Sequence, residues 1–170
     1  MTKIVLAFPC IGKTYYAQNH PGTALDLESS DYLFDRTGYE HLTSEEFKGI
    51  PNRKPKENGI AEYVNAIDEA VNSGKYDYIF TAQNPDIVHG ILALGYDVHY
   101  LKPLPTTKSE TVFKQRAKAR GNNDRWIDNV IKFIKQSPLA LFSDEELEHV
   151  YIHLVPSESY VTDVIDNGIL

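Results

Sequence analysis

The sequence predicts an α/β protein: a three-layer sandwich whose central sheet has five strands, mostly parallel. Two observations predict this class. Short apolar segments rich in Val, Ile and Tyr alternate with longer segments in which apolar residues recur at helical spacing, the pattern of parallel strands joined by crossover helices. The chain has 170 residues, 42% hydrophobic and 24% charged, which fits one folded domain over 1–170 and excludes a disordered chain.

The expected strands are segments rich in β-branched and aromatic residues. They cover residues 3–8, 23–27, 76–81, 98–101 and 150–155. A helix is expected over 13–19, directly after the first strand, and a short helical piece near 44–47. The segment 49–58 holds Pro51 and Pro55 and is expected to be a loop.

The later helices are marked by their first residues or by their spacing. Asn84 and Pro85 are typical of the cap and first position of a helix. Thr107 stands three residues before Glu110, which is the spacing of a capping box, so a basic helix is expected to begin there. The expected helices cover residues 59–73, 85–94, 107–120 and 123–136.

Charge and cysteine content exclude several functions. The net charge is −7, whereas nucleic-acid-binding domains usually carry a basic excess, so nucleic acid is not an expected partner. Cys10 is the one cysteine and forms no internal disulfide, which fits a reducing cytoplasm. The apolar run that ends at Phe8 is too short for a signal-peptide core or a membrane span, so we expect a cytoplasmic protein without membrane contact.

Residues 7–14 read Ala-Phe-Pro-Cys-Ile-Gly-Lys-Thr and match the phosphate-binding pattern G-x-x-x-x-G-K-[ST], except that Ala7 replaces the first glycine. They lie between the first expected strand and its helix, which is the setting that this pattern requires. Backbone N–H groups from Ile11 to Thr14 would bind a polyphosphate at the helix N-terminus, and Gly12 would allow its close approach. Lys13 would reach the β and γ phosphates, and the Thr14 hydroxyl would bind Mg²⁺.

With this loop, the expected fold is of the P-loop NTPase type. The alternative is an ordinary strand–turn–helix corner with a surface lysine.

Two carboxylates, Asp26 and Glu28, end the second expected strand. Ligands of open parallel sheets bind beyond the carboxyl ends of the strands. Asp26 is therefore expected to bind Mg²⁺ or to act on an acceptor hydroxyl, and Glu28 to bind the acceptor substrate. The alternative is that Asp26 or a following serine only caps the next helix.

Positive charge is concentrated in the helix expected before Gly121. Arg116 and Arg120 lie four residues apart and so share one helix face, which could close over the phosphates as a catalytic lid formed by residues 106–136. The alternative is a solvated charged face.

Two further residues are candidate substrate contacts. Gln83 follows the third expected strand and could contact a base or a phosphate; otherwise it is a polar residue at a helix entry. Lys54, with its neighbour Arg53, could contact an acceptor phosphate, or could remain solvated on an exposed loop.

These residues carry a family resemblance. The loop at 7–14 is similar to the G-x-P-G-x-G-K-[ST] loop of adenylate kinases and related nucleoside monophosphate kinases, and Asp26-Leu27-Glu28 resembles the D-x-D of shikimate-kinase-like enzymes. The chain also resembles small phage-encoded P-loop proteins of the nucleotide-kinase-like group, which have an Asp-x-[Asp/Glu]-Ser-Ser segment and an Arg-x-x-x-Arg-Gly-Asn lid, here Arg116 to Asn122. If the chain is phage-encoded, the compartment would be the host cytoplasm. Ala7 and Cys10 depart from the adenylate kinase loop, which has glycines there.

The resulting hypothesis is a Mg²⁺-dependent kinase that moves the γ-phosphoryl group of ATP to a small acceptor, a nucleoside monophosphate or a nucleoside. Two alternatives stay open: a non-catalytic NTP-binding sensor or interaction module, and a kinase acting on polynucleotide ends. The sequence does not specify the acceptor, the base preference or the oligomeric state.

Overall fold

A computed structural model describes all 170 residues of the chain, apart from the side chain of Glu45. Five strands form one sheet in the order β2-β3-β1-β4-β5, and every neighbouring pair is parallel. The strands are β1 (Lys3–Ala7), β2 (Ala24–Asp26), β3 (Tyr78–Thr81), β4 (Val98–Pro103) and β5 (Val150–Val155).

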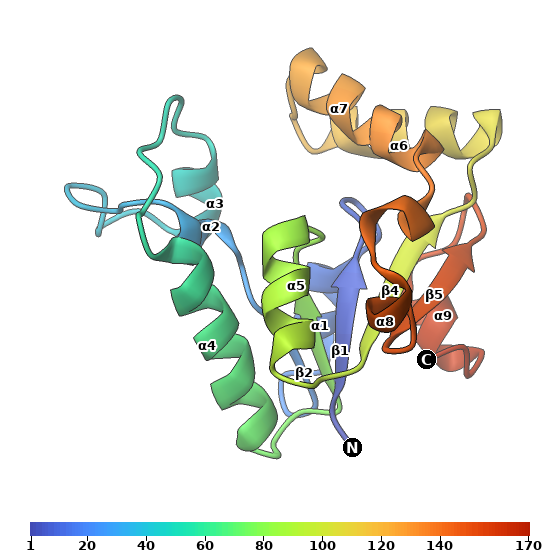
Figure 1. Cartoon of the computed structure of the whole chain (residues 1–170). Helices are drawn as coiled ribbons and strands as arrows, with labels where there is room; N and C mark the ends of the chain where they lie inside the picture. Colours follow the sequence, from blue (N-terminus) through green and yellow to red (C-terminus); the bar gives the residue numbers. More distant parts are fainter.

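The helices cover both faces of this sheet (Figure 1). They are α1 (Lys13–Asn19), α2 (Ser30–Leu33), α3 (Ser44–Lys48), α4 (Gly59–Asn72), α5 (Pro85–Ala93), α6 (Thr107–Ala119), α7 (Asp124–Lys135), the 3₁₀ helix η1 (Pro138–Leu141), α8 (Asp144–Leu147) and α9 (Val161–Asp166). The predicted three-layer α/β sandwich with five strands is confirmed, and all of its strands are parallel. Assignment to the P-loop NTPase type stays a prediction.

The alternation of side chains along the strands divides the core into two layers. Val5 and Phe80 pack against α1 and α9 on one face of the sheet. Ile4 and Leu6 pack against α4 and α5 on the other. Both faces of β1 are therefore buried, which fixes the central strand from which residues 8–12 emerge.

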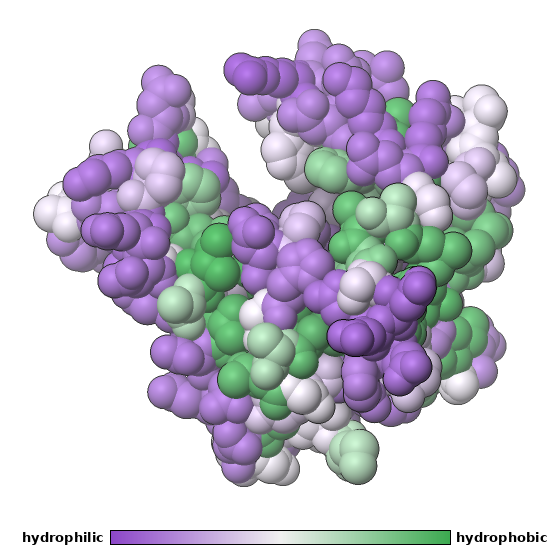
Figure 2. All heavy atoms as spheres, in the orientation of Figure 1, coloured by the Kyte–Doolittle hydropathy of each residue, from purple (hydrophilic) through white to green (hydrophobic). Residues whose placement is uncertain are grey.

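Two projections rise above the carboxyl edge of the sheet, where the strand arrows point in Figure 1. We call residues 27–58, which include α2 and α3, the arm, and residues 106–136, which include α6 and α7, the lid. The lid has its own small core, in which Phe8 packs edge-on against Phe113 with 5.4 Å between ring centroids. The surface is hollowed between the arm and the lid, as Figure 2 shows.

Local capping differs from the sequence prediction at one helix. The residue that caps α6 is Thr106, whose hydroxyl accepts a hydrogen bond from the Ser109 backbone N–H, and Thr107 is the first helical residue. The capping box expected from Thr107 and Glu110 was therefore wrong by one position. The neighbouring threonine is preferred because its hydroxyl also lies 3.1 Å from the Ser109 hydroxyl.

No helix in the part of the chain that the structure describes is both long enough and apolar enough to cross a membrane.

Candidate active site

The loop between β1 and α1 has the backbone conformation of a tight turn around its glycine. Gly12 caps α1 with a φ of 93°, a left-handed conformation that costs little only in glycine. A Cβ atom built on Gly12 would also lie 3.1 Å from the Tyr160 ring. The backbone N–H groups of Lys13 and Thr14 begin α1, so they have no intrahelical carbonyl to bind and are available to an anion.

Cys10 has a φ of 63°, although it is not a glycine. This is the position where the adenylate kinase loop that the sequence resembles has a glycine. The loop is held on its other side by the Ile11 carbonyl, which accepts a hydrogen bond from the Val161 backbone N–H at 2.9 Å. Ile11 itself is fully buried, so only its backbone is available to a ligand.

Two predicted residues, Lys13 and Thr14, meet at the carboxylate of a third, Asp26. The Lys13 ammonium donates to Asp26 Oδ1 at 2.8 Å, and the Thr14 hydroxyl donates to Asp26 Oδ2 at 2.6 Å. The Asp26 side chain is only 9% exposed and that of Lys13 21%. Asp26 is not a helix cap, since α2 begins at Ser30, four residues later. The structure thus joins the loop to the end of β2 through the residues that the sequence selected.

The second predicted carboxylate, Glu28, lies two residues beyond the end of β2, so the expectation that it ends this strand was wrong. Glu28 pairs with Lys48 of α3 at 2.5 Å and accepts a hydrogen bond from the Ser30 hydroxyl at 2.7 Å. Burial opposes the ionisation of Glu28, but the hydrogen bonds from Lys48 and Ser30 and the charges of Lys48 and Lys13 outweigh it and lower its pKa.

Asp26, Glu28 and Thr14 all line one cleft of about 500 Å³ between α1, β2 and the arm. This volume lies in the range of small-molecule sites. The backbone between the two carboxylates is fixed by Tyr63, which is fully buried and donates its hydroxyl to the Leu27 carbonyl at 2.7 Å. The helical spacing of Tyr63 is that of a core residue, so the sequence pattern alone does not indicate this contact near the site.

Gln83 uses its side-chain amide to join two strands. Its Nε2 donates to the Leu6 carbonyl of β1 at 2.8 Å and to the Leu101 carbonyl of β4 at 2.7 Å. Both amide hydrogens are thereby used, so Gln83 offers a ligand only its oxygen, which can only accept. Contact with a phosphate oxygen through the amide N–H would require breaking one of these bonds; contact with a base stays a prediction.

The two lid arginines differ in their surroundings. Arg116 donates to the carbonyls of Ser159 at 3.2 Å and Glu158 at 2.8 Å, and its guanidinium lies 3.8 Å from the centroid of the Tyr160 ring. The alternative of a solvated charged face is therefore wrong for Arg116. These contacts hold Arg116 against the loop that precedes α9, where Tyr160 also lies next to Gly12.

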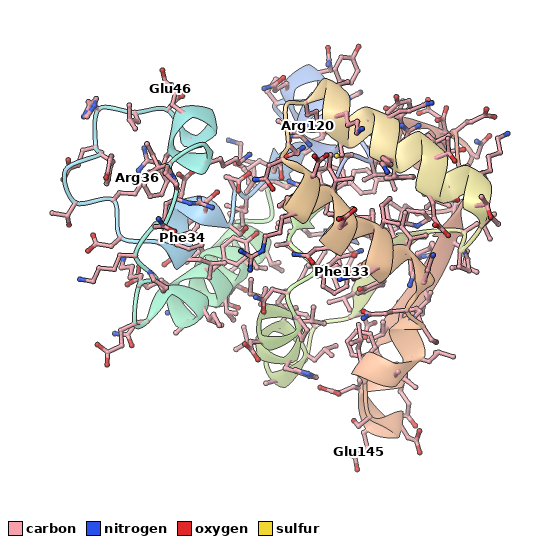
Figure 3. All side chains as sticks on the ribbon, turned by 90° about the horizontal axis from the view of Figure 1, so that it is seen from above. Phe34, Arg36, Glu46, Arg120, Phe133 and Glu145 are labelled. Atoms are coloured by element: carbon pink, nitrogen blue, oxygen red, sulfur yellow. The ribbon has the colours of Figure 1, made fainter. Side chains whose placement is uncertain are left out.

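Arg120 is exposed at the end of α6, and Figure 3 shows it on the side of the lid nearer to the arm. Its Nη1 lies 3.9 Å from the Cys10 sulfur, which places the guanidinium beside the loop between β1 and α1. Of the two lid arginines, Arg120 is thus the one free to turn toward a ligand.

The arm residue predicted to bind the acceptor, Lys54, has a side chain that is 81% exposed and lies 3.6 Å from Asp35. Its neighbour Arg53 has the more unusual environment. The Arg53 guanidinium stacks 4.0 Å from the Phe34 ring centroid, and its Nη1 is buried without a hydrogen-bond partner. Burial lowers the pKa of Arg53, opposed by the charge of nearby Glu28. Sequence alone did not separate the two residues, because both lie in a polar, proline-rich loop.

Within the described side chains, no group of three or more His, Cys, Asp or Glu residues is arranged to hold a metal ion. A metal bound here would need ligands from elsewhere in addition to Asp26 and Thr14. Mg²⁺ meets this condition, because it is usually held by one or two carboxylates together with substrate phosphates.

Comparison with known proteins adds little to this description. No family model matches the chain, and no curated protein matches it. Among solved structures, the chain is similar to an uncharacterized protein from Eubacterium ventriosum ATCC 27560, with 13% sequence identity, a TM-score of 0.45, and coverage of 99% of this chain and 94% of the other. A likeness of this extent supports no conclusion about activity, so the function must be inferred from the residues themselves.

Proposed function

We propose that the protein is an ATP- and Mg²⁺-dependent phosphotransferase of the P-loop type, which moves the γ-phosphoryl group to a small phosphorylated acceptor of the nucleoside monophosphate class. The observation that carries the proposal is the convergence of Lys13 and Thr14 on Asp26 at the N-terminus of α1, at 2.8 and 2.6 Å. A lysine, a hydroxyl, a carboxylate and free backbone N–H groups are the set that phosphoryl transfer requires.

The contact with Asp26 also holds the Lys13 ammonium at the N-terminus of α1, where a phosphate would bind. Asp26 neutralises Lys13 while the site holds no anion, and a polyphosphate at the helix N-terminus would compete for the same ammonium. Lys13 would then bind phosphate oxygens and leave the Asp26 carboxylate available for a metal ion. Phosphoryl transfer needs mainly position and charge from the protein, and these residues supply both.

The oxygen atoms of Thr14 and Asp26 fit Mg²⁺, which prefers hydroxyl, carboxylate and phosphate oxygens. Bound there, Mg²⁺ would neutralise charge that develops on the phosphates during transfer. Lys13 and the N–H groups at the start of α1 would hold the polyphosphate in line.

Arg53 favours a phosphorylated acceptor over a nucleoside. A buried guanidinium N–H without a partner is costly, and an anionic oxygen would satisfy it. Glu28 lines the cleft together with Asp26, and its charge acts on Arg53, so an acceptor phosphate at Arg53 would stand on the arm near this cleft.

The lid supplies positive charge to the same region. Residues 106–136 contain eight Lys and Arg against three Asp and Glu, in a protein whose net charge is −7. Among the lid cations, Arg120 is in contact with the loop between β1 and α1, through Cys10. Closure of the lid would bring this charge onto the phosphates and exclude water.

The test is ATP consumption measured with Mg²⁺ against nucleosides, nucleoside monophosphates and oligonucleotide ends. We expect turnover with at least one monophosphate, and an Arg53→Gln variant with a KM for that acceptor raised about 10-fold or more but an unchanged KM for ATP, as for loss of one bond to a charged group. Tight ATP binding without turnover on any acceptor would instead identify a nucleotide-binding module.

A further inference from the structure

Lys102 is a buried lysine at the carboxyl end of β4. Lys102 is only 4% exposed, and five of the six residues of β4 are buried. Lysine is almost never fully buried unless its charge is paired. Among the side chains that the structure describes, no carboxylate forms an ion pair with this ammonium. A cation in this position lacks the counterion that burial normally requires.

The ammonium has one hydrogen-bond partner. Lys102 Nζ donates to the Phe133 carbonyl at 2.8 Å. Phe133 lies in the last turn of α7, whose carbonyls have no intrahelical partner, so this bond caps the helix and ties the lid to the sheet. An ammonium has three donors, and the other two are without a protein acceptor among the described residues. The bond to the Phe133 carbonyl therefore explains where the Lys102 side chain points, but it does not neutralise the positive charge of the ammonium.

The position of Lys102 is close to the phosphate-type loop. β1 and β4 are neighbours, and Ala7, the first residue of the loop, is paired with Leu101. Neighbouring strands lie about 4.8 Å apart, so Lys102 stands beside the first residues of the loop. Gln83 fixes this arrangement, because its amide holds the Leu101 carbonyl directly before Lys102 and the Leu6 carbonyl directly before Ala7.

We propose that the Lys102 ammonium is a second phosphate-binding cation of the site, in addition to Lys13, and that it acts from the end of β4 beneath α7 of the lid. This inference rests on the proposed phosphotransferase function. The ligand class is a phosphate ester or anhydride, whose oxygens accept hydrogen bonds from the two free donors and supply the missing negative charge. Burial lowers the pKa of Lys102, which agrees with a buried charge that is not paired with a carboxylate.

The proposal differs from a purely structural role in what it predicts for binding. If Lys102 only caps α7, its removal loosens the lid but leaves anion affinity unchanged. If it binds phosphate, removing the charge weakens the anion while the fold remains, because replacement of an unpaired buried charge costs little stability. Lys102→Gln is the informative variant, since it keeps a donor for the Phe133 carbonyl and removes the charge.

The experiment is isothermal titration calorimetry of the full chain with inorganic tripolyphosphate, as the donor-like probe, and with adenosine monophosphate, as the acceptor-like probe. The variants are Lys102→Gln, Lys13→Ala and, as the control, Lys75→Gln, which removes an exposed charge at the opposite end of the sheet, before β3. We expect Lys102→Gln to weaken one probe by about 10- to 100-fold, as for a hydrogen bond to a charged group, and Lys75→Gln to change neither. The affected probe identifies which phosphate Lys102 binds.

Unchanged affinity for both probes in Lys102→Gln, with tripolyphosphate binding lost in Lys13→Ala, would overturn the role of Lys102 and leave the proposed function intact. Absence of tripolyphosphate binding by the wild-type protein would overturn both. If Lys102→Gln does not fold, the ¹⁵N resonance of the Lys102 ammonium in the wild-type protein tests the same question, whether this ammonium binds phosphate. A shift of this resonance upon addition of either probe supports the proposal, and an unmoved resonance at saturation refutes it.

Discussion

Replacement of Asp26 by asparagine separates the chemical role of this carboxylate from its structural role. In the ligand-free protein, Asp26 accepts charge-assisted bonds from Lys13 at 2.8 Å and Thr14 at 2.6 Å. Such bonds contribute about 1.5–3 kcal/mol each, but Lys13 can regain water and asparagine keeps one acceptor oxygen, so the net loss of stability should be about 1–2 kcal/mol. For a chain of 170 residues this lowers Tm by roughly 2–8 °C.

The effect of Asp26→Asn on catalysis should be much larger than its effect on binding. We expect kcat with Mg²⁺ and ATP to fall by about two to three orders of magnitude, as for other single electrostatic groups. Binding of tripolyphosphate without Mg²⁺ should be unchanged or tighter, because Lys13 is released from its carboxylate. Thermal melts, calorimetry and steady-state kinetics measure the three quantities. Asp77→Asn, an exposed residue at the opposite end of the sheet, is the control. Parental kcat in Asp26→Asn would refute the reasoning.

Three further outcomes follow from the geometry. Lys13→Ala should abolish ATP-dependent turnover while circular dichroism stays unchanged; parental turnover would remove the phosphate-loop assignment. Arg116→Ala should lower Tm, because it loses two hydrogen bonds to carbonyls and the stacking on the Tyr160 ring. Arg120→Ala should instead lower kcat about 10²-fold and leave Tm unchanged, because Arg120 is exposed. Equal Tm values for the two variants would contradict this difference. Because the folded pKa of Glu28 is lowered, its stabilisation is complete above the ordinary value of 4.5 and lost as pH falls through the folded pKa. The free energy of unfolding of Glu28→Gln should therefore fall less steeply over this acid range than that of the parent, and parallel curves would argue against a lowered pKa.

The fold was predictable because its determinants are local and repeated. The helix at 13–19 and the strand at 150–155 have the predicted boundaries, since a phosphate-loop pattern and a run of β-branched residues mark them clearly. The short helices α8 and α9 were not predicted. Four-residue and six-residue helices have too few turns to show a period. α8 buries none of its residues, and α9 packs against α1 through Val161 and Val164.

The candidate site divides in the same way. The contact of Lys13, Thr14 and Asp26 was predictable, because parallel strands bring their carboxyl ends to one edge of the sheet. The environments of Arg53 and Lys102 were not predictable, because a sequence does not distinguish a buried basic side chain from an exposed one. Their significance comes from missing partners, and only three-dimensional packing shows that a partner is missing.

The most direct test of the central claim is to follow the γ-phosphoryl group itself. ATP labelled at the γ position is incubated with the protein, Mg²⁺ and a mixture of nucleoside monophosphates, and the labelled products are separated. The account predicts label in a nucleoside diphosphate at a rate that Lys13→Ala abolishes. Label that remains in ATP, or appears only as inorganic phosphate whichever acceptor is present, would contradict it.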